Sequence, residues 1–148
     1  MQIFAFAVFA SLVAAAAAFG SMFGPGDWYA ALAKPSWTPP GWMFGPVWGV
    51  LYVMIAFAGW LAWRSGATTA VAVWAFGLVL NAAWSWLFFG EHRIGLAALD
   101  IVALSVTIVL FIVLVGRASR GASLLFVPYL VWICFATALN VMIWHLNR

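Results

Sequence analysis

The fold is decided by apolar runs such as IGLAALDIVALSVTIVLFIVLV, which spans residues 94–115 and contains one charged residue, Asp100. A helix needs about 20 mostly apolar residues to cross the roughly 30 Å hydrocarbon core of a bilayer. Backbone groups cannot stay unpaired in lipid, so each such run is expected to be an α-helix. Four further runs meet this requirement, at residues 2–22, 45–63, 69–89 and 123–144. We therefore predict an all-α membrane protein, a five-helix transmembrane bundle forming one domain over residues 1–148.

The composition excludes several classes of protein. Of the 148 residues, 68% are hydrophobic and 6% are charged, whereas a soluble domain carries about 25% charged residues. The net charge of +3 comes from scattered basic residues, which do not form the basic patch of a nucleic-acid-binding protein. With Cys134 as the only cysteine, no internal disulfide and no thiolate metal site is expected. We predict a multi-pass protein with the lipid bilayer as a partner, no metal and no nucleic acid.

Charge does not orient the predicted helices in the membrane. Five spans place three basic residues on each side: Arg64, Arg117 and Arg120 on one, and Lys34, Arg93 and Arg148 on the other. The positive-inside rule therefore favours neither orientation.

The connection between the first two spans is long, and it is rich in tryptophan and proline. Residues 27–42 read DWYAALAKPSWTPPGW, and the prolines make this segment stiff and irregular, with a short helix expected over residues 28–34. One interpretation is an interfacial anchor. The other, which we favour, is a lid that closes one end of the bundle. The spacing of Gly41, Gly45 and Gly49 further predicts a groove where another backbone approaches closely.

Three polar side chains, Asn81, Asp100 and Asn140, lie inside the spans. For Asp100 we favour a hydrogen bond between helices over a ligand or proton role. Residues three, four, seven or eight apart share one side of a helix. Three such faces combine aromatic rings with polar groups: Trp48 and Tyr52; Asn81, Trp84 and Phe88; and Trp132, Ala136 and Asn140. They fit either plain core packing or the wall of an apolar cavity with a few hydrogen-bonding groups.

Catalytic chemistry is not indicated by the residues themselves. His92 lies in a charged loop and His145 in the last turn of a span, and neither shares a face with a nucleophile or an acid. No catalytic residue and no obligatory cofactor is predicted on this basis.

Three blocks of residues match the pattern of a known family. They are Trp28-Tyr29-x-x-Leu32-x-Lys34-Pro35-x-Trp37-x-Pro39-Pro40-x-Trp42-x-Phe44-Gly45-Pro46-x-Trp48-x-x-Leu51-Tyr52, then Asn81-x-x-Trp84-x-x-x-Phe88-Phe89-Gly90, and Pro128-Tyr129-Leu130-x-Trp132-x-x-x-Ala136-x-x-Leu139-Asn140. In order and spacing they resemble the TspO/MBR family, the tryptophan-rich sensory proteins related to the translocator protein or peripheral benzodiazepine receptor. The match covers nearly the whole chain.

The resemblance implies a five-helix homodimer that binds porphyrins or haem-like tetrapyrroles in a pocket under the first loop. Some relatives also bind cholesterol or benzodiazepine-type drugs. Carried over residue by residue, the ligand-binding walls would be Trp37, Trp48, Tyr52, Asn81, Trp84, Phe88, Trp132, Ala136 and Asn140. Asn140 continues to Trp144 without the tyrosine of the animal sterol motif. This departure argues against sterol binding, and it favours the bacterial type and a bacterial membrane without fixing which membrane.

Three functions follow as hypotheses. The leading one is a membrane receptor or sensor for a porphyrin-like ligand, which regulates tetrapyrrole metabolism or a stress response. The second is a transporter of tetrapyrroles, lipids or sterols. The third is an enzyme that degrades porphyrin in light, for which the resemblance makes Trp37 and Trp132 the candidate redox residues. Whether the protein is an enzyme stays open at this point.

Overall fold

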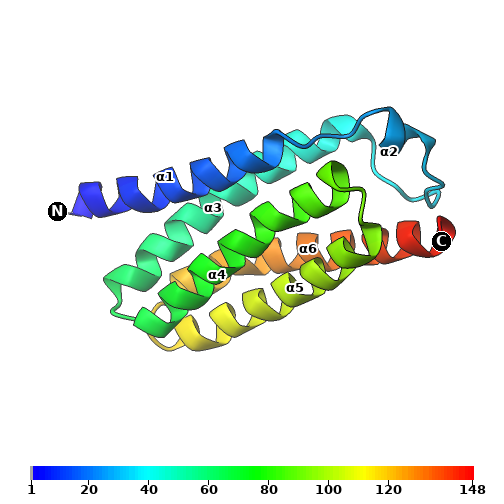
Figure 1. Cartoon of the computed structure of the whole chain (residues 1–148). Coiled ribbons are helices and arrows are strands. Elements are labelled where there is room, and N and C mark those ends of the chain that lie inside the picture. The colour runs from blue at the N-terminus through cyan, green and yellow to red at the C-terminus, as the bar shows by residue number, and fades with distance from the viewer. Residues whose placement is uncertain (1) are drawn as a thin grey trace.

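The computed structural model describes residues 2–148, which form a bundle of long helices (Figure 1). Five helices are long and apolar enough to cross a membrane, so the predicted all-α transmembrane fold is confirmed. They are α1 (Gln2–Ser21), α3 (Phe44–Arg64), α4 (Thr68–Ser85) with its π-helical continuation η2 (Trp86–Gly90), α5 (Ile94–Gly116) and α6 (Arg120–Leu146). Two short elements lie between α1 and α3, namely α2 (Asp27–Ala31) and the 3-10 turn η1 (Gly41–Met43).

Local interactions explain where the bounds differ from the prediction. Helix α6 begins three residues early, because the Ser119 side chain accepts a hydrogen bond from the Ala122 amide (3.3 Å) and so caps a free N–H of the first turn. Helix α2 is shorter than the expected 28–34. Its chain is already extended at Leu32 (ψ 142°), and Lys34 precedes a proline, which disfavours helical backbone there.

Helix α1 is an integral part of the bundle and packs against α3 and α4. Its side chains Phe9 and Val13 are buried. The contact is closest at Gly59 of α3, where a Cβ atom would lie 2.5 Å from the Trp74 ring and 2.9 Å from the Phe9 ring. Glycine is therefore the residue that lets these three helices meet.

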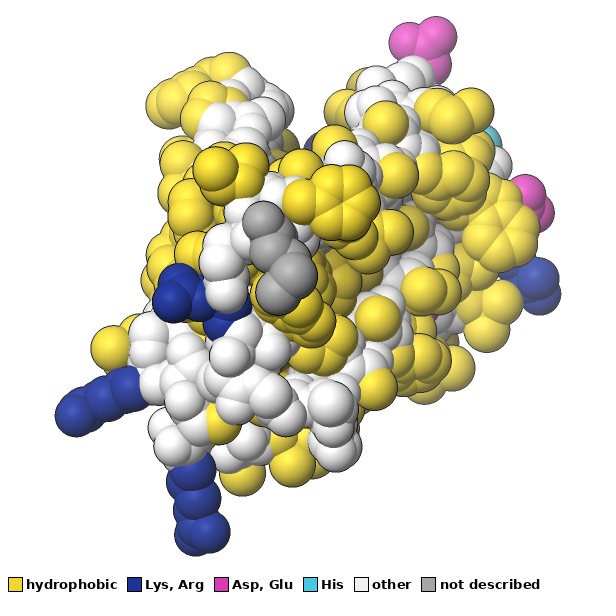
Figure 2. All heavy atoms as spheres, turned by 90° about the vertical axis from the view of Figure 1, so that its left-hand side faces the viewer, with side chains coloured by type: hydrophobic (Ala, Val, Ile, Leu, Met, Phe, Trp, Pro, Cys, Tyr) yellow, Lys and Arg dark blue, Asp and Glu magenta, His cyan; other side chains and the backbone are white. Residues whose placement is uncertain are grey.

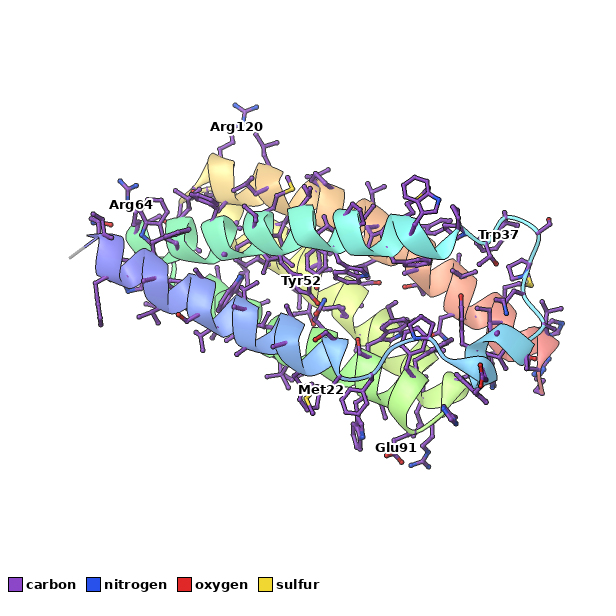
Figure 3. The ribbon with its side chains drawn as sticks, turned by 90° about the horizontal axis from the view of Figure 1, so that it is seen from above. Met22, Trp37, Tyr52, Arg64, Glu91 and Arg120 are labelled. Atoms are coloured by element: carbon purple, nitrogen blue, oxygen red, sulfur yellow. The ribbon has the colours of Figure 1, made fainter. Side chains whose placement is uncertain are left out.

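The outer surface of the bundle suits lipid on its flanks and water at its ends. Large hydrophobic side chains stay exposed along the helices, for example Val53, Leu99 and Val131. Figure 2 looks onto one end, where Lys or Arg side chains project while hydrophobic side chains cover the flanks. Figure 3 shows that Arg64 and Arg120 belong to this end, and that Trp37 and Glu91 lie at the opposite one.

Candidate functional site

A cavity of about 570 Å³ lies inside the bundle next to the α1–α3 loop. Its volume falls within the roughly 300–1,000 Å³ typical of small-molecule sites. All five long helices contribute to its wall, and the loop contributes its roof. Besides the predicted faces, the lining includes Ala17, Gly20 and Ser21 of α1, Phe44 and Gly45 of α3, Ser85 of α4, Phe89 of η2, Ile101 and Leu104 of α5, and Leu139 and Ile143 of α6.

The floor of the cavity is a chain of hydrogen bonds across three helices. The Tyr52 hydroxyl donates to Asn81 Oδ1 (3.1 Å), and Asn81 Nδ2 donates to the Tyr129 hydroxyl (2.9 Å). Asn81 and Tyr129 are 4% and 3% exposed. Buried polar groups need partners, so these three residues satisfy one another and fix α3, α4 and α6 at this level. Figure 3 shows Tyr52 well inside the bundle, about midway along α3.

A second polar contact joins α4, α5 and α6 higher in the cavity. The Trp84 indole donates to Asn140 Oδ1 (2.9 Å), and Asn140 Nδ2 donates to the Ile94 carbonyl (3.0 Å). Asn140 is 2% exposed, and both of these hydrogen bonds join its amide to other groups of the protein. The contact fixes the Trp84 ring against the cavity.

Aromatic faces make up much of the remaining wall. Trp48 stacks on Tyr52 with ring centroids 5.3 Å apart, and Trp84 stacks on Phe88 at 5.2 Å. Phe44 meets the Trp132 ring edge-on at 5.8 Å. These rings expose flat, apolar surface of the kind on which another aromatic ring packs well.

The span that contains α4 ends in the π-helical turn η2, which borders the cavity. Both Phe88 and Phe89 of this turn line the cavity. Such turns are rare and occur frequently at functional sites.

The roof is formed by α2 and the residues that follow it. Trp28 and Tyr29 pack edge-on against Phe88, with ring centroids 5.9 and 6.1 Å apart. The Trp28 ring also stacks on the His92 ring, at 4.0 Å. Burial raises the pKa of the Tyr29 hydroxyl above its usual 10.0. Although His92 is exposed, it is not simply a solvated loop residue, because it supports the roof.

Lys34 closes the end of α2 and is the one charged side chain among the cavity-lining residues that the structure describes. Its ammonium group donates to the carbonyls of Tyr29 (2.6 Å), Leu32 (2.9 Å) and Ala30 (3.2 Å). A cation is well placed at a helix C-terminus. No Asp or Glu belongs to the described lining, so the charge gives the upper cavity a positive potential.

The faces predicted from helical spacing all meet at this cavity, whereas one residue carried over from the family resemblance, Trp37, does not reach it. Trp48, Tyr52, Asn81, Trp84, Phe88, Trp132, Ala136 and Asn140 all line it. Trp37 does not: it is 45% exposed and packs against Phe135 instead. A turn closed by the Thr38 amide on the Pro35 carbonyl (3.0 Å) carries Trp37 to the outside.

The prediction for Asp100 was wrong. Asp100 makes no hydrogen bond between helices, and its Oδ2 atom is buried without a partner among the described residues. At Gly41, Gly45 and Gly49 no atom lies within 4 Å of an added Cβ, so the groove there is open, and the approach of another backbone stays a prediction. Gly45 leaves a wall of the cavity open.

The arrangement suits binding rather than acid–base chemistry. The described lining contains neither His nor Cys and, as noted, no carboxylate. What it offers is stacking surface, amide and hydroxyl groups and one cation.

Comparison with known proteins agrees with this architecture. The model of the TspO/MBR family matches residues 7–145. The chain belongs to the TspO/MBR family. Among its relatives, protein CrtK of Rhodobacter capsulatus is 36% identical over 99% of this chain and 95% of its own length. The tryptophan-rich protein TspO of Archaeoglobus fulgidus is 44% identical over 81% of this chain and 80% of its own. The Homo sapiens translocator protein is 40% identical over 87% and 82%.

Membership of the TspO/MBR family confirms the resemblance drawn from the three sequence blocks and, with five apolar helices, a multi-pass integral membrane protein. The structure adds what each block does in this chain. The first supplies the roof and the α3 wall, the second the α4 wall and the π turn, and the third the α6 wall. Sequence reasoning missed the linings from α1 and α5, for which no motif or polar face gave a signal.

Proposed function

We propose that this TspO/MBR protein is a membrane receptor that binds a porphyrin-like tetrapyrrole in the cavity. The observation that carries the proposal is the aromatic wall: Trp48, Trp84 and Trp132 come from three helices and border one space of about 570 Å³. A flat macrocycle would gain offset stacking against such rings, worth about 0.5–1.5 kcal/mol per ring pair beyond the area buried.

The roof favours a ligand with acidic groups at its edge. Lys34 gives the upper cavity a positive charge that no described lining carboxylate neutralises. Porphyrins with carboxylate side chains combine an apolar face with such an edge, so the macrocycle would lie between the aromatic walls with its acidic edge toward Lys34. The receptor would be expected to act as a homodimer, which crosslinking in membranes tests.

Light-dependent degradation of the bound porphyrin is a second candidate because the Trp132 ring lines the cavity. An indole beside an excited macrocycle is placed for electron transfer, whereas Trp37 lies outside the lining. Illumination of the complex tests this. The porphyrin absorbance should fall more slowly in Trp132→Phe than in the parent protein, and at the parent's rate in Trp37→Phe. Equal loss in both variants and the parent excludes it.

The receptor proposal is tested by filling the cavity. Ala136 lines the cavity, while Ala138 on the same helix is exposed and does not. Protoporphyrin is titrated into purified protein in nanodiscs, and its binding is followed by the quenching of tryptophan fluorescence. The affinity of Ala136→Phe should be at least tenfold lower than that of the parent. Ala138→Phe is the matched control and should bind normally. Equal affinity in both variants means that the porphyrin binds elsewhere, and the proposal fails.

A further inference from the structure

Among the described residues, one side chain beyond the end of α6, Asn147, hydrogen-bonds the roof of the cavity. Its amide pairs with both backbone groups of a single loop residue: the Ala33 N–H donates to Asn147 Oδ1 (3.0 Å), and Asn147 Nδ2 donates to the Ala33 carbonyl (2.9 Å). The two residues are 114 positions apart in the sequence. Neither backbone group of Ala33 belongs to a helix, so the side chain supplies what a helix would supply elsewhere.

Helix α6 reaches this point because it is longer than a membrane span requires. Its 27 residues correspond to about 40 Å, against a hydrocarbon core of roughly 30 Å. Asn147 follows its last turn and also donates to the Ile143 carbonyl (2.7 Å). Since Ile143 lines the cavity, the fastening lies one helical turn above the cavity wall. In Figure 1 the end of α6 lies beside the loop that follows α2.

Ala33 is placed where a fastening controls the roof. It directly precedes Lys34, whose ammonium group holds the carbonyls of Tyr29 and Leu32. Tyr29 and Lys34 are both cavity-lining residues. Holding Ala33 therefore holds the part of the roof that carries the cation.

The two ends of the roof are attached by different forces. The α2 end is packed through Trp28 and Tyr29 on Phe88, an apolar contact that separates only by exposing hydrophobic surface. Both hydrogen bonds to Ala33 are solvent-exposed, so water can take the place of each partner when the contact opens. Near Ala33 the roof also packs on α6, through Leu32 in the apolar cluster around Leu139 and Ile143 and through Trp37, which meets Phe135 edge-on at 5.7 Å. We expect the roof to open at this side, where Trp37 is exposed and both hydrogen bonds face water, and to hinge at α2.

We propose that Asn147 is a positioning residue that fastens the cavity roof, so that its two hydrogen bonds to Ala33 set the rate at which molecules exchange between water and the cavity. The opening itself requires no particular ligand. The consequence for porphyrin exchange rests on the proposed function.

The first experiment needs no ligand. In a Cys134→Ala background, Ala136→Cys places a thiol in the cavity wall, and a charged, membrane-impermeant thiol reagent reports its access from water in nanodiscs. Cys134 is removed because it is exposed. Asn147→Leu should raise the labelling rate about fivefold to thirtyfold, the lower part of the range for two hydrogen bonds, since both bonds are exposed. Asn147→Asp keeps the acceptor for the Ala33 N–H but places a carboxylate oxygen against the carbonyls of Ala33 and Ile143, so its labelling rate should rise at least as much.

His145→Leu is the matched control. His145 lies on the same exposed end and contacts Arg148 rather than the loop. Its labelling rate should equal that of the parent. Hydrogen exchange of the peptide containing Ala33 should rise in Asn147→Leu and stay unchanged in His145→Leu.

Labelling and exchange rates in Asn147→Leu equal to those of the parent would overturn the proposal. So would equal increases in Asn147→Leu and His145→Leu, since the change would then be general loosening. If Asn147→Leu loses its helical circular dichroism, the labelling rate and the hydrogen exchange of Asn147→Asp are compared with those of the parent, and they test the proposal in the same way.

The second experiment tests the functional consequence. Protoporphyrin should dissociate about fivefold to thirtyfold faster from Asn147→Leu, with an unchanged rate in His145→Leu. If porphyrin binds neither variant nor the parent, the proposed function fails while the thiol experiment still judges the fastening. If porphyrin binds but its release rate is unchanged, the exchange role of Asn147 is wrong.

Discussion

Replacing Asn81 by leucine should test whether the hydrogen-bonded floor holds the bundle together. Asn81→Leu keeps the approximate volume but removes the acceptor for Tyr52 and the donor to Tyr129. Tyr129 is 3% exposed, so its hydroxyl cannot turn to bulk water, and an unsatisfied buried hydroxyl costs about 1–3 kcal/mol. Tyr52 lines the cavity and can bond water there, so its lost bond costs about 0.5–1 kcal/mol.

The free energy of unfolding should therefore fall by about 1.5–4 kcal/mol. Hydrogen bonds between membrane helices can be weaker, averaging about 0.6 kcal/mol in one well-studied case. The larger loss is expected here because Asn81→Leu leaves the Tyr129 hydroxyl buried without a partner, instead of removing both partners of a hydrogen bond. Reversible unfolding by SDS in mixed micelles, followed by circular dichroism, gives the difference between variant and parent.

A double variant separates this mechanism from simple mispacking of the leucine. Tyr129→Phe removes the hydroxyl that Asn81→Leu would orphan, so Asn81→Leu with Tyr129→Phe should recover about 1–2 kcal/mol relative to the sum of the single variants. A loss below about 0.5 kcal/mol in Asn81→Leu, or single losses that simply add, would refute the account of the floor as a satisfied polar network.

Three other perturbations follow from particular contacts. Gly59→Ala should lower the free energy of unfolding in SDS by about 1–3 kcal/mol, because the new Cβ would lie 2.5 Å from the Trp74 ring. Gly49→Ala is the control and should leave the free energy of unfolding unchanged, because the space around Gly49 is open. An equal loss in both variants would contradict the close-packing argument. Lys34→Gln should weaken protoporphyrin binding about fivefold, or about 1 kcal/mol, but leave the affinity of its dimethyl ester unchanged, whereas equal weakening of both would indicate roof damage rather than lost charge. Because burial raises the pKa of the Tyr29 hydroxyl, the stability that its neutral form contributes is complete below about pH 10 and is lost as the pH rises through the folded-state pKa. The thermal unfolding temperature of Tyr29→Phe should therefore fall less at alkaline pH than that of the parent. Identical pH profiles of the two proteins would exclude this contribution of Tyr29.

The sequence was sufficient for the five spans and for most of the cavity faces. Span length and low charge are properties of single segments, and helical spacing places Trp132, Ala136 and Asn140 on one side whatever they contact. Spacing alone could not decide between core and cavity, because that depends on how far the facing helices are apart. The same limit hid Ile101 and Leu104 of α5, which are indistinguishable in the sequence from lipid-facing neighbours.

The roof was the least predictable part because its geometry depends on contacts between distant segments. The direction of Trp37 follows from the turn at Pro35, and the position of Ala33 follows from Asn147. The π turn at Trp86–Gly90 likewise has no spacing signal, and Phe89, which lines the cavity, lies within it. Each of these features concerns a few dihedral angles rather than a periodic pattern.

The floor divides the bundle into two levels with different tasks. Below Asn81, helices α1, α3 and α4 meet closely at Gly59, and side chains such as Phe9 and Trp74 fill the space. Above it, α1 and α3 contribute small residues, Gly20 and Gly45, and the interior stays open. The lower level is thus close-packed, while the upper level carries a void and a roof fastened by exposed hydrogen bonds. Ligand exchange at the roof then requires no disruption of the lower core, because the elements that move are those with few buried apolar contacts.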